Sequence, residues 1–335
     1  MKVDFRQKEY LIKDIKGLTE KVCLLSGFEP EKLIYKGEVR REDWIGSLVY
    51  QGSHKNKSTI LKIQGLRPEQ EEPDIMQSFM NQNKSKLIRT PYIFWHHPWN
   101  IKDKFGAFIM ENVKAPQIFN YPYASQKQKN LFKDFYEEFH LNALKKPWEK
   151  AFKDELTNVQ FFKKRLERLK KERLDIKLPK EDKERINLFS NLVDKEMLSF
   201  PLVFTHGHLG AEDIRFDGKQ YVIMSNLAWG YKLEFYDLVF IIWGCLHKIR
   251  DKNLTLEKAQ KLIDEWFNTY KKSLYLKKHK DLKIKTQYCL LYFILSSIVL
   301  QLYSDEHKKT ASKEELNNLF YVHRQLFDKL YRDMV

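Results

Sequence analysis

The sequence predicts an α+β protein, with antiparallel strands near its start and a mostly helical remainder. Three strand-like runs come early, at residues 32–36, 45–51 and 58–64. The turn-rich stretch 52–57 separates the last two, as expected of neighbouring antiparallel strands. From about Ser125 onward, apolar residues recur at the three- and four-residue spacing of amphipathic helices.

Length and composition indicate a chain that packs a core. Its 335 residues allow one large domain or two ordinary ones. A hydrophobic share of 43%, with 14% aromatic residues, is ample for a packed interior. The content of only 12 Gly and 10 Pro argues against long disordered tracts.

The cysteines and the apolar segments favour the cytoplasm. Cys23, Cys245 and Cys289 are widely spaced and match neither a metal site nor a disulfide framework, which is typical of a reducing compartment. Residues 1–5 lack the apolar region of a signal peptide. The most apolar run, residues 288–303, is shorter than the usual membrane span of about 18 residues. We therefore expect a buried helix there.

The formal net charge is +15, and the basic residues are interleaved with acidic ones along most of the chain. Such an excess raises the local concentration of anions, whether ATP or nucleic acid. No helix-turn-helix, zinc finger or RNA-binding signature accompanies it, so nucleic acid is not the expected partner. The lysine-rich tract 163–183 is expected to be the solvated face of a helix with Glu–Lys pairs. A basic arm for an anionic partner is the alternative.

Helices are predicted on both sides of the strand-like runs. One amphipathic helix is expected at residues 8–28, and Gly27 suits its end. Two apolar stripes follow the strands, within residues 131–144 and 156–169. The last part of the chain predicts helices at residues 238–246, 256–270, 285–303 and 313–334.

Residues 205–216 carry a concentrated set of polar groups between two apolar runs. This stretch places two histidines, Glu212 and Asp213 within eight residues. An apolar run at 200–204 precedes it and another at 221–224 follows it, and both predict short buried strands. A loop held between two strands is a common position for a functional site.

The motif resembles the catalytic loop of the aminoglycoside and choline kinase-like phosphotransferases, which are related to protein kinases. That loop reads His-Gly-Asp, four residues, then Asn, and the Asp is the catalytic base. Here His206 and Gly207 match, His208 occupies the position of the base, and Asp213 occupies that of the metal-binding Asn. A second metal-binding Asp is expected about twelve residues later, where this chain has Ser225.

The resemblance implies a two-lobed protein kinase-like fold with ATP and Mg²⁺ as cofactors. Residues 1–112 would form the lobe with the sheet, and residues 113–335 the helical lobe that carries the loop at 205–216. A nucleotide or small molecule would bind in the cleft between the lobes. His206 and Asp237 would have structural roles, and Asp237 would brace the loop; core packing and helix capping are the plainer interpretations.

The resemblance also assigns residues in the first lobe. Lys62 would bind phosphate and pair with a Glu at the start of the next helix, either Glu72 or its neighbour Glu71; a solvent-facing Lys is the plainer interpretation. A turn at residues 37–44 would cover the phosphates, although it has one Gly and three acidic residues. The backbone that holds adenine would come from Met110, Glu111 and Asn112, which a core strand and its exit also explain.

The substitutions predict altered chemistry. Phosphoryl transfer depends on metal ions that bridge the phosphates, and Mg²⁺ prefers oxygen ligands such as carboxylates. Ser225 offers only a hydroxyl unless Glu212 or Glu234 replaces the missing carboxylate, and a protonated His208 would repel the metal. We expect a pseudokinase-like or strongly impaired phosphotransferase that binds a nucleotide, a small ligand or a protein. The alternatives are an active small-molecule kinase that uses His208 and Asp213, and a basic nucleic-acid scaffold.

Overall fold

The computed structural model describes residues 12–39, 44–66, 71–144, 158–172, 178–195, 202–224, 229–300, 302 and 310–335. The chain forms two compact units. The first comprises Met1–Pro116 and the later segment Arg215–Leu227, and the second comprises Gln117–Ile214 and Ala228–Val335. Each unit is described separately below.

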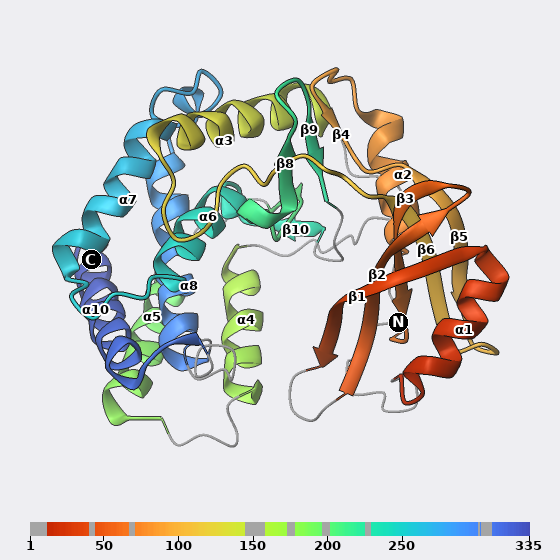
Figure 1. Ribbon diagram of the computed structural model, residues 1–335. Coiled ribbons are helices and arrows are strands. Elements are labelled where there is room, and N and C mark those ends of the chain that lie inside the picture. Colours follow the sequence, from red (N-terminus) through yellow and green to blue (C-terminus); the bar gives the residue numbers. More distant parts are fainter. Residues whose placement is uncertain are drawn as a thin grey trace. The chain divides into compact units, whose positions relative to one another are not determined.

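A five-stranded antiparallel sheet forms the first unit, in the order β1-β2-β3-β6-β5 (Figure 1). The three predicted strand-like runs lie within its first three strands, and the turn at residues 55–56 joins the second to the third. The strands are β1 (Phe28–Val39), β2 (Trp44–His54), β3 (Lys57–Gln64), β5 (Ile93–Asn100) and β6 (Phe105–Glu111).

Helices α1 and α2 belong to the same unit as this sheet, whose side chains alternate between its two faces. Helix α1 (Ile15–Ser26) begins with Asp14, which accepts from Gly17 N, and ends at Gly27 in the left-handed region. It is shorter than the predicted helix, whose first residues lie outside the described range. Its Val22 packs with Leu61 and Ile63 in one buried cluster. Helix α2 (Glu72–Gln82) has Pro73 in its first turn and buries Ile75, Met76 and Phe79.

A three-stranded sheet, β4-β9-β8, contains strands far apart in the sequence. Strands β4 (Ile88–Arg89) and β9 (Tyr221–Ile223) pair in parallel, although more than a hundred residues separate them. Strand β8 (Ile214–Phe216) follows the polar loop directly. Gln220 also donates to Lys86 O at 2.8 Å, so these contacts hold the segment after the loop against the first unit.

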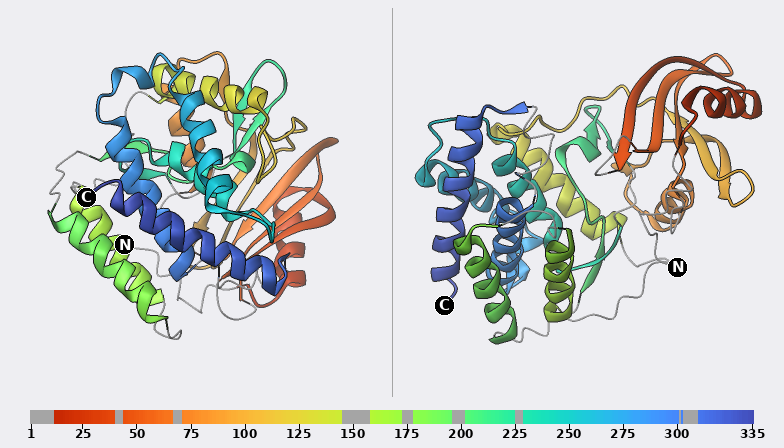
Figure 2. Two further views of the ribbon diagram at one scale, coloured as in Figure 1. Left: turned by 90° about the vertical axis from the view of Figure 1, so that its left-hand side faces the viewer. Right: turned by 90° about the horizontal axis from the view of Figure 1, so that it is seen from below.

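The described residues of the second unit are mainly helical, with a short antiparallel pair of β7 (Val203–Thr205) and β10 (Gly230–Lys232). Figure 2 shows α4 and α5 lying side by side, in agreement with their contacts. The helices are α3 (Gln126–Glu138), the π-helix η2 (Phe139–Ala143), α4 (Asn158–Glu172), α5 (Lys180–Lys195), the 3-10 helix η3 (Ala211–Asp213), α6 (Tyr236–His247), α7 (Leu256–Tyr270), the 3-10 helix η4 (Leu276–Lys278), α8 (Leu282–Val299) and α10 (Lys313–Arg332).

The core of the second unit centres on α6 and α8. Helix α8 is long and apolar enough to cross a membrane by composition alone, yet 78% of that window is buried inside the protein. It packs against α6, α5 and α10. The prediction of a buried helix in this region is therefore confirmed, with bounds at Leu282–Val299.

The lysine-rich tract forms parts of α4 and α5, with residues 173–177 outside the described range. Lys163 pairs with Asp194 at 2.6 Å, Lys170 with Glu167 at 3.6 Å, and Lys180 with Glu184 at 3.8 Å. Phe162 and Leu166 of α4 are buried on the other side. In its described parts, the prediction of a solvated helix face with Glu–Lys pairs is confirmed, although two helices rather than one carry the tract.

Candidate functional site

In the first unit, Lys62 forms an ion pair with Glu72. Leu61 and Ile63 face the cluster with α1, so strand alternation turns Lys62 to the opposite face of β3. Glu72 lies in the first turn of α2, and its side chain is only 3% exposed. The Lys62 ammonium also lies 6.0 Å from the centre of the Phe108 ring. A buried carboxylate thus holds one cation in a fixed position on the sheet.

Glu71, the other candidate partner of Lys62, makes different contacts. Its Oε1 accepts from Trp99 N at 3.0 Å, and its Oε2 lies 3.7 Å from His96 Nε2. It therefore ties the start of α2 to β5. The geometry selects Glu72, rather than Glu71, as the carboxylate that faces Lys62.

The segment Met110–Asn112 is held by its side chains at the end of β6. Arg89 donates to both carboxylate oxygens of Glu111, at 2.6 and 2.9 Å, and the pKa of Arg89 is raised mainly by this bond. Asn112 donates to Ser58 Oγ at 3.0 Å, and Met110 pairs with Ile60 across the sheet. The Glu111 carboxylate is thus engaged within the unit, and its side chain fixes the path of the backbone.

The turn expected to cover phosphates joins β1 to β2, and residues 40–43 lie outside the described range, including Arg40 and Arg41. The one glycine of this stretch, Gly37, lies within β1 opposite Ser47. A Cβ atom at Gly37 would lie 2.1 Å from Ser47 Oγ. This glycine therefore permits the close pairing of two strands and does not belong to a flexible turn.

In the second unit, Asp237 fixes the start of the polar loop. Its carboxylate accepts from Thr205 Oγ1 at 2.5 Å and from Gly207 N at 3.0 Å, and Gly207 has a φ of 77°. Burial raises the pKa of Asp237, while the charge of His206 and the bond from Thr205 oppose this rise. His206 is fully buried next to Trp229, at 4.7 Å between ring centres. These contacts brace the loop, and Phe235 rather than Asp237 is the N-cap of α6.

His208 and Asp213 contact each other within the loop. The distance from His208 Nδ1 to Asp213 Oδ2 is 3.3 Å, and the same oxygen accepts from Gly210 N at 2.8 Å. The His208 side chain is 49% exposed, and its ring lies 4.5 Å from that of Phe240. Burial lowers the pKa of His208, but the bond and charge of Asp213 and the charge of Glu212 outweigh it, so the pKa is raised.

Two further groups shape the loop beyond the residues that the sequence identified as catalytic. Glu212 folds back so closely that a Cβ atom at Gly210 would lie 2.8 Å from its carboxylate. Burial, and then the charge of Asp213, raise the pKa of Glu212. The Tyr121 hydroxyl accepts from Ala211 N at 3.1 Å. Tyr121 lies 90 residues before Ala211 in the sequence, and no motif marks it.

The second expected metal position, Ser225, lies outside the described residues. Glu234, one of two carboxylates that could replace it, is engaged elsewhere. Its Oε2 is 2.5 Å from Lys285 Nζ, and its Oε1 is 3.4 Å from His279 Nδ1. Asp281 also pairs with Lys285, at 2.6 Å. Glu234, His279 and Asp281 have the spacing of a metal site, but the Lys285 ammonium already pairs with both carboxylates.

The donor set of the loop fits a divalent cation poorly. Asp213 supplies one carboxylate, but its Oδ2 already binds an amide and lies beside an imidazole with a raised pKa. A protonated imidazole at that position repels a metal ion. Glu212 is close but prefers its neutral form more than an ordinary glutamate does. The loop therefore retains its architecture more completely than its metal-binding chemistry.

Comparison with known proteins gives structural matches alone. No family model and no curated protein sequence matches the chain. Among solved structures, the ternary complex of the aminoglycoside phosphotransferase APH(2")-IIa with streptomycin and ATP matches with a TM-score of 0.55 and 14% identity, over 94% of this chain and 99% of that one.

Two other matches have similar coverage. A thermostable variant of the aminoglycoside phosphotransferase APH(4)-Ia, with ADP and hygromycin B bound, has a TM-score of 0.59 and 8% identity, over 95% of this chain and 98% of that one. A choline/ethanolamine kinase family protein from Mesorhizobium loti has a TM-score of 0.58 and 11% identity, over 95% and 99%. The resemblance inferred from the loop motif is thus confirmed at the level of the fold: the chain has the α+β, two-lobed, protein kinase-like fold of the aminoglycoside phosphotransferases and choline kinase-like proteins.

Proposed function

We propose that this protein is a phosphotransferase-like, pseudokinase-type protein that binds a nucleotide but transfers phosphoryl groups poorly. The carrying observation is a contrast between two sets of residues. The ion pair between Lys62 and Glu72 is complete. The loop has His208, tied to Asp213, where the resembled family has its catalytic base.

The first part of the contrast supports nucleotide binding. An ammonium on a central strand, oriented by a buried carboxylate, is the arrangement that places a cation on nucleotide phosphates in kinase-like folds. Two of the structural neighbours were solved with ATP or ADP. The side chain of Lys62 is 21% exposed, so this residue is not sealed inside the core. We assign Lys62 and Glu72 to phosphate binding, and the backbone of Met110, Glu111 and Asn112 to the base.

The second part supports weak catalysis. In the resembled family, metal ions bridge the phosphates and neutralise the charge that develops during transfer. Here Asp213, in place of the family's Asn, is the one carboxylate at the two metal positions, and it already contacts His208 and Gly210. Ser225 supplies no carboxylate. We therefore expect the nucleotide to bind with little help from Mg²⁺.

Thermal unfolding with ATP, Mg-ATP and Mn-ATP tests the proposal, because a ligand that binds only the native state raises the melting temperature. At about 100 times its Kd, such a ligand adds about 2.7 kcal/mol to the stability. We expect ATP alone to stabilise the wild type and Mg²⁺ to add little. Lys62→Ala should lose the effect, whereas Lys57→Ala, exposed on the same strand, should retain it. No shift at millimolar nucleotide would contradict nucleotide binding.

One observation favours a second candidate, an active small-molecule kinase. Asp213 contacts Nδ1 of His208, and the imidazole is about half exposed, so its Nε2 could accept a proton from an acceptor hydroxyl. In that case His208→Ala should lower ATP turnover in the presence of an acceptor, without weakening nucleotide binding. Turnover that is undetectable in the wild type and in His208→Ala alike excludes this candidate.

The remaining assignments concern partners and location. We propose a small molecule or the nucleotide itself as the natural ligand, with a protein as an additional partner of a pseudokinase-type chain. The free thiols of Cys23, Cys245 and Cys289 suit a reducing compartment, and we propose the cytoplasm. No described feature favours a nucleic-acid scaffold beyond the net charge of +15.

A further inference from the structure

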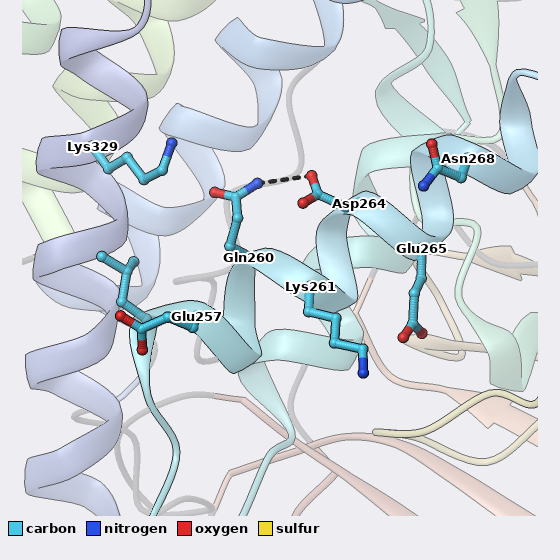
Figure 3. Close-up of a pocket in the computed structure, with 8 residues that line it drawn as sticks. Glu257, Gln260, Lys261, Asp264, Glu265, Asn268 and Lys329 are labelled. Carbon is cyan, nitrogen blue, oxygen red and sulfur yellow. Dashed lines mark hydrogen bonds between the residues drawn. The ribbon is translucent and has the colours of Figure 1, made fainter.

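Two hollows of the helical unit adjoin α7. The larger, about 530 Å³, is an open groove lined by one face of α7 and by Lys329 of α10 (Figure 3). The smaller, about 260 Å³, is lined by α7, by the chain that follows α6, and by the segment around the start of α3. Lys261 and Glu265 border both, and Figure 3 shows their side chains pointing to the same side of α7. The smaller hollow has the features of a ligand site.

Its walls are mostly apolar and rigid. Trp266, Ile249 and Leu254 are 1%, 3% and 6% exposed, so the core holds them in place. Leu262 and the segment from Pro122 to Ala124 complete the apolar lining. Small-molecule sites in proteins combine such a lining with a few charged groups that fix the orientation of the ligand.

One of the charged groups that line this hollow is Lys129, a buried lysine of α3. Its side chain is only 7% exposed, and its ammonium lies 5.9 Å from the centre of the Trp266 ring. A buried ammonium is costly unless an anion accompanies it. That anion is Glu265, whose Oε2 lies 2.5 Å from Lys129 Nζ.

Glu265 differs from Lys129 in being replaceable. Its side chain is 44% exposed, so it can turn into water at little cost once another anion pairs with Lys129, whereas Lys129 stays buried. The anion of a ligand could therefore take its place beside Lys129. The burial of the cation and the exposure of its partner together make the hollow a receptor for an incoming anion.

The rim of the hollow also has excess positive charge. Lys258 pairs with Asp251 at 3.4 Å and donates to Asn253 O at 2.8 Å, and Lys261 stands next to it. The lining thus contains three lysines and two carboxylates. The net charge of the lining is therefore positive, and it becomes more positive when the Glu265 carboxylate turns into water.

We propose that this hollow binds a small organic anion, with a carboxylate or phosphate on Lys129 in place of Glu265 and an apolar body against Trp266. The site is formed entirely by the helical unit and does not involve Lys62, Glu72 or the polar loop. It is therefore independent of the proposed function. A phosphate and a carboxylate have the same charge chemistry here, and the choice of probes separates them.

Calorimetric titration of the full-length protein with benzoate, phenyl phosphate and uncharged benzamide tests the site. We expect at least one of the two anions to bind and benzamide not to bind. Glu265→Gln removes the internal competitor and should tighten anion binding by about tenfold, which equals about 1.4 kcal/mol. Lys129→Met should weaken it by at least about tenfold. Lys271→Met, at the C-terminal end of the same helix, should leave it unchanged.

Several outcomes would overturn the proposal. Equal affinity for benzoate and benzamide would show that the charge of Lys129 is not used. Unchanged anion affinity in Glu265→Gln would show that the carboxylate does not compete. If Lys129→Met fails to fold, Glu265→Gln and Lys261→Met, both at exposed or rim positions, still test the site. Nucleotide titration of Lys129→Met should match the wild type, which separates this site from phosphate binding at Lys62.

Discussion

The Nδ1 atom of His208 lies 3.3 Å from Oδ2 of Asp213, so the position of the catalytic base and a position of the metal ligand are occupied by groups that bind each other. In the resembled family these two positions carry an Asp and an Asn, which cannot form such an ion pair. The contact gives the loop an internal partner for its carboxylate. It thereby explains in physical terms why the retained architecture need not support metal-dependent chemistry.

This contact predicts the protonation of His208. The pKa of His208 is raised, despite its partial burial, by the bond and charge of Asp213. Asp213→Asn removes the negative charge and should lower that pKa, whereas Glu212→Gln, which removes only a more distant charge, should lower it less. Proton NMR titration of the His208 ring measures both changes. An unchanged pKa in Asp213→Asn would mean that the ion pair does not form in solution.

Substitution of the family's residues at positions 208 and 225 should restore phosphoryl transfer. His208→Asp with Ser225→Asp returns a carboxylate base and a second metal ligand to a loop that Asp237 still braces. We expect Mg²⁺-dependent ATP turnover to rise by about a hundredfold, the usual scale of one general base. The matched control, His208→Asn with Ser225→Asn, has similar size without the carboxylates and should stay inactive. If the Asp variant binds ATP but does not turn it over, the assignment of this loop as a kinase-like catalytic loop would be contradicted.

Local rules were sufficient for some residues of the candidate site and insufficient for others. The pair of Lys62 with a Glu could be predicted from the family resemblance together with one local rule, since Pro73 marks a helix start at which Glu71 and Glu72 were both candidates, and the structure selects Glu72. The contacts of Tyr121 with Ala211 and of Arg89 with Glu111 could not, because their partners are remote in sequence and meet only through tertiary packing.

The fold shows the same limit. The first three strands and the buried helix α8 follow from side-chain periodicity, which is a local property. The return of Arg215–Leu227 to the first unit depends on the parallel pairing of β4 with β9; the apolar run of β9 predicted a strand, but the two-residue partner β4 leaves almost no periodic signal. His208 and Asp213 were found by spacing within a motif, but their mutual contact required the structure.

The ion pair at Lys62 should contribute to stability as well as to binding. Glu72→Gln leaves the ammonium of Lys62 with a neutral partner in a largely buried position. We expect a loss of about 1–3 kcal/mol in the free energy of unfolding and weaker nucleotide binding. Asp74→Asn, which alters an exposed acidic residue in the same first turn of α2, is the control and should change both quantities little. Denaturant unfolding measures the first quantity, and the melting shift with ATP measures the second.

Substitution of Asp182 should strongly lower the stability of the helical unit. This fully buried carboxylate of α5 accepts two bonds from Arg324 of α10, at 2.9 and 2.7 Å, and one from Arg185 at 3.1 Å. Asp182→Asn removes the buried negative charge that accepts from both guanidinium groups and should cost about 3 kcal/mol or more. Asp328→Asn removes a partner of Arg185 that is 45% exposed, and should cost less than about 1 kcal/mol. Similar losses in both variants would show that burial of Asp182 does not matter.

His140 provides a pH dependence opposite in sign to that of His208. Its ring stacks on Tyr275 at 5.3 Å, and burial, with a smaller effect of His279, lowers its pKa to about 3. Between pH 6.5 and about 3 the unfolded chain binds a proton at this residue and the folded chain does not, so stability falls as the pH falls through this window. The slope from one such group is at most about 1.4 kcal/mol per pH unit. His140→Phe keeps the stacked ring and should remove this part of the slope in denaturant unfolding at pH 4 to 7. A slope that His140→Phe leaves intact would mean that other groups, and not this imidazole, govern the acid sensitivity of the helical unit.

In His208→Ala the pH dependence should be the reverse. The raised pKa of His208 stabilises the native state below the unfolded pKa of 6.5, and this stabilisation fades as the pH rises. The stability lost in His208→Ala should therefore be largest at low pH.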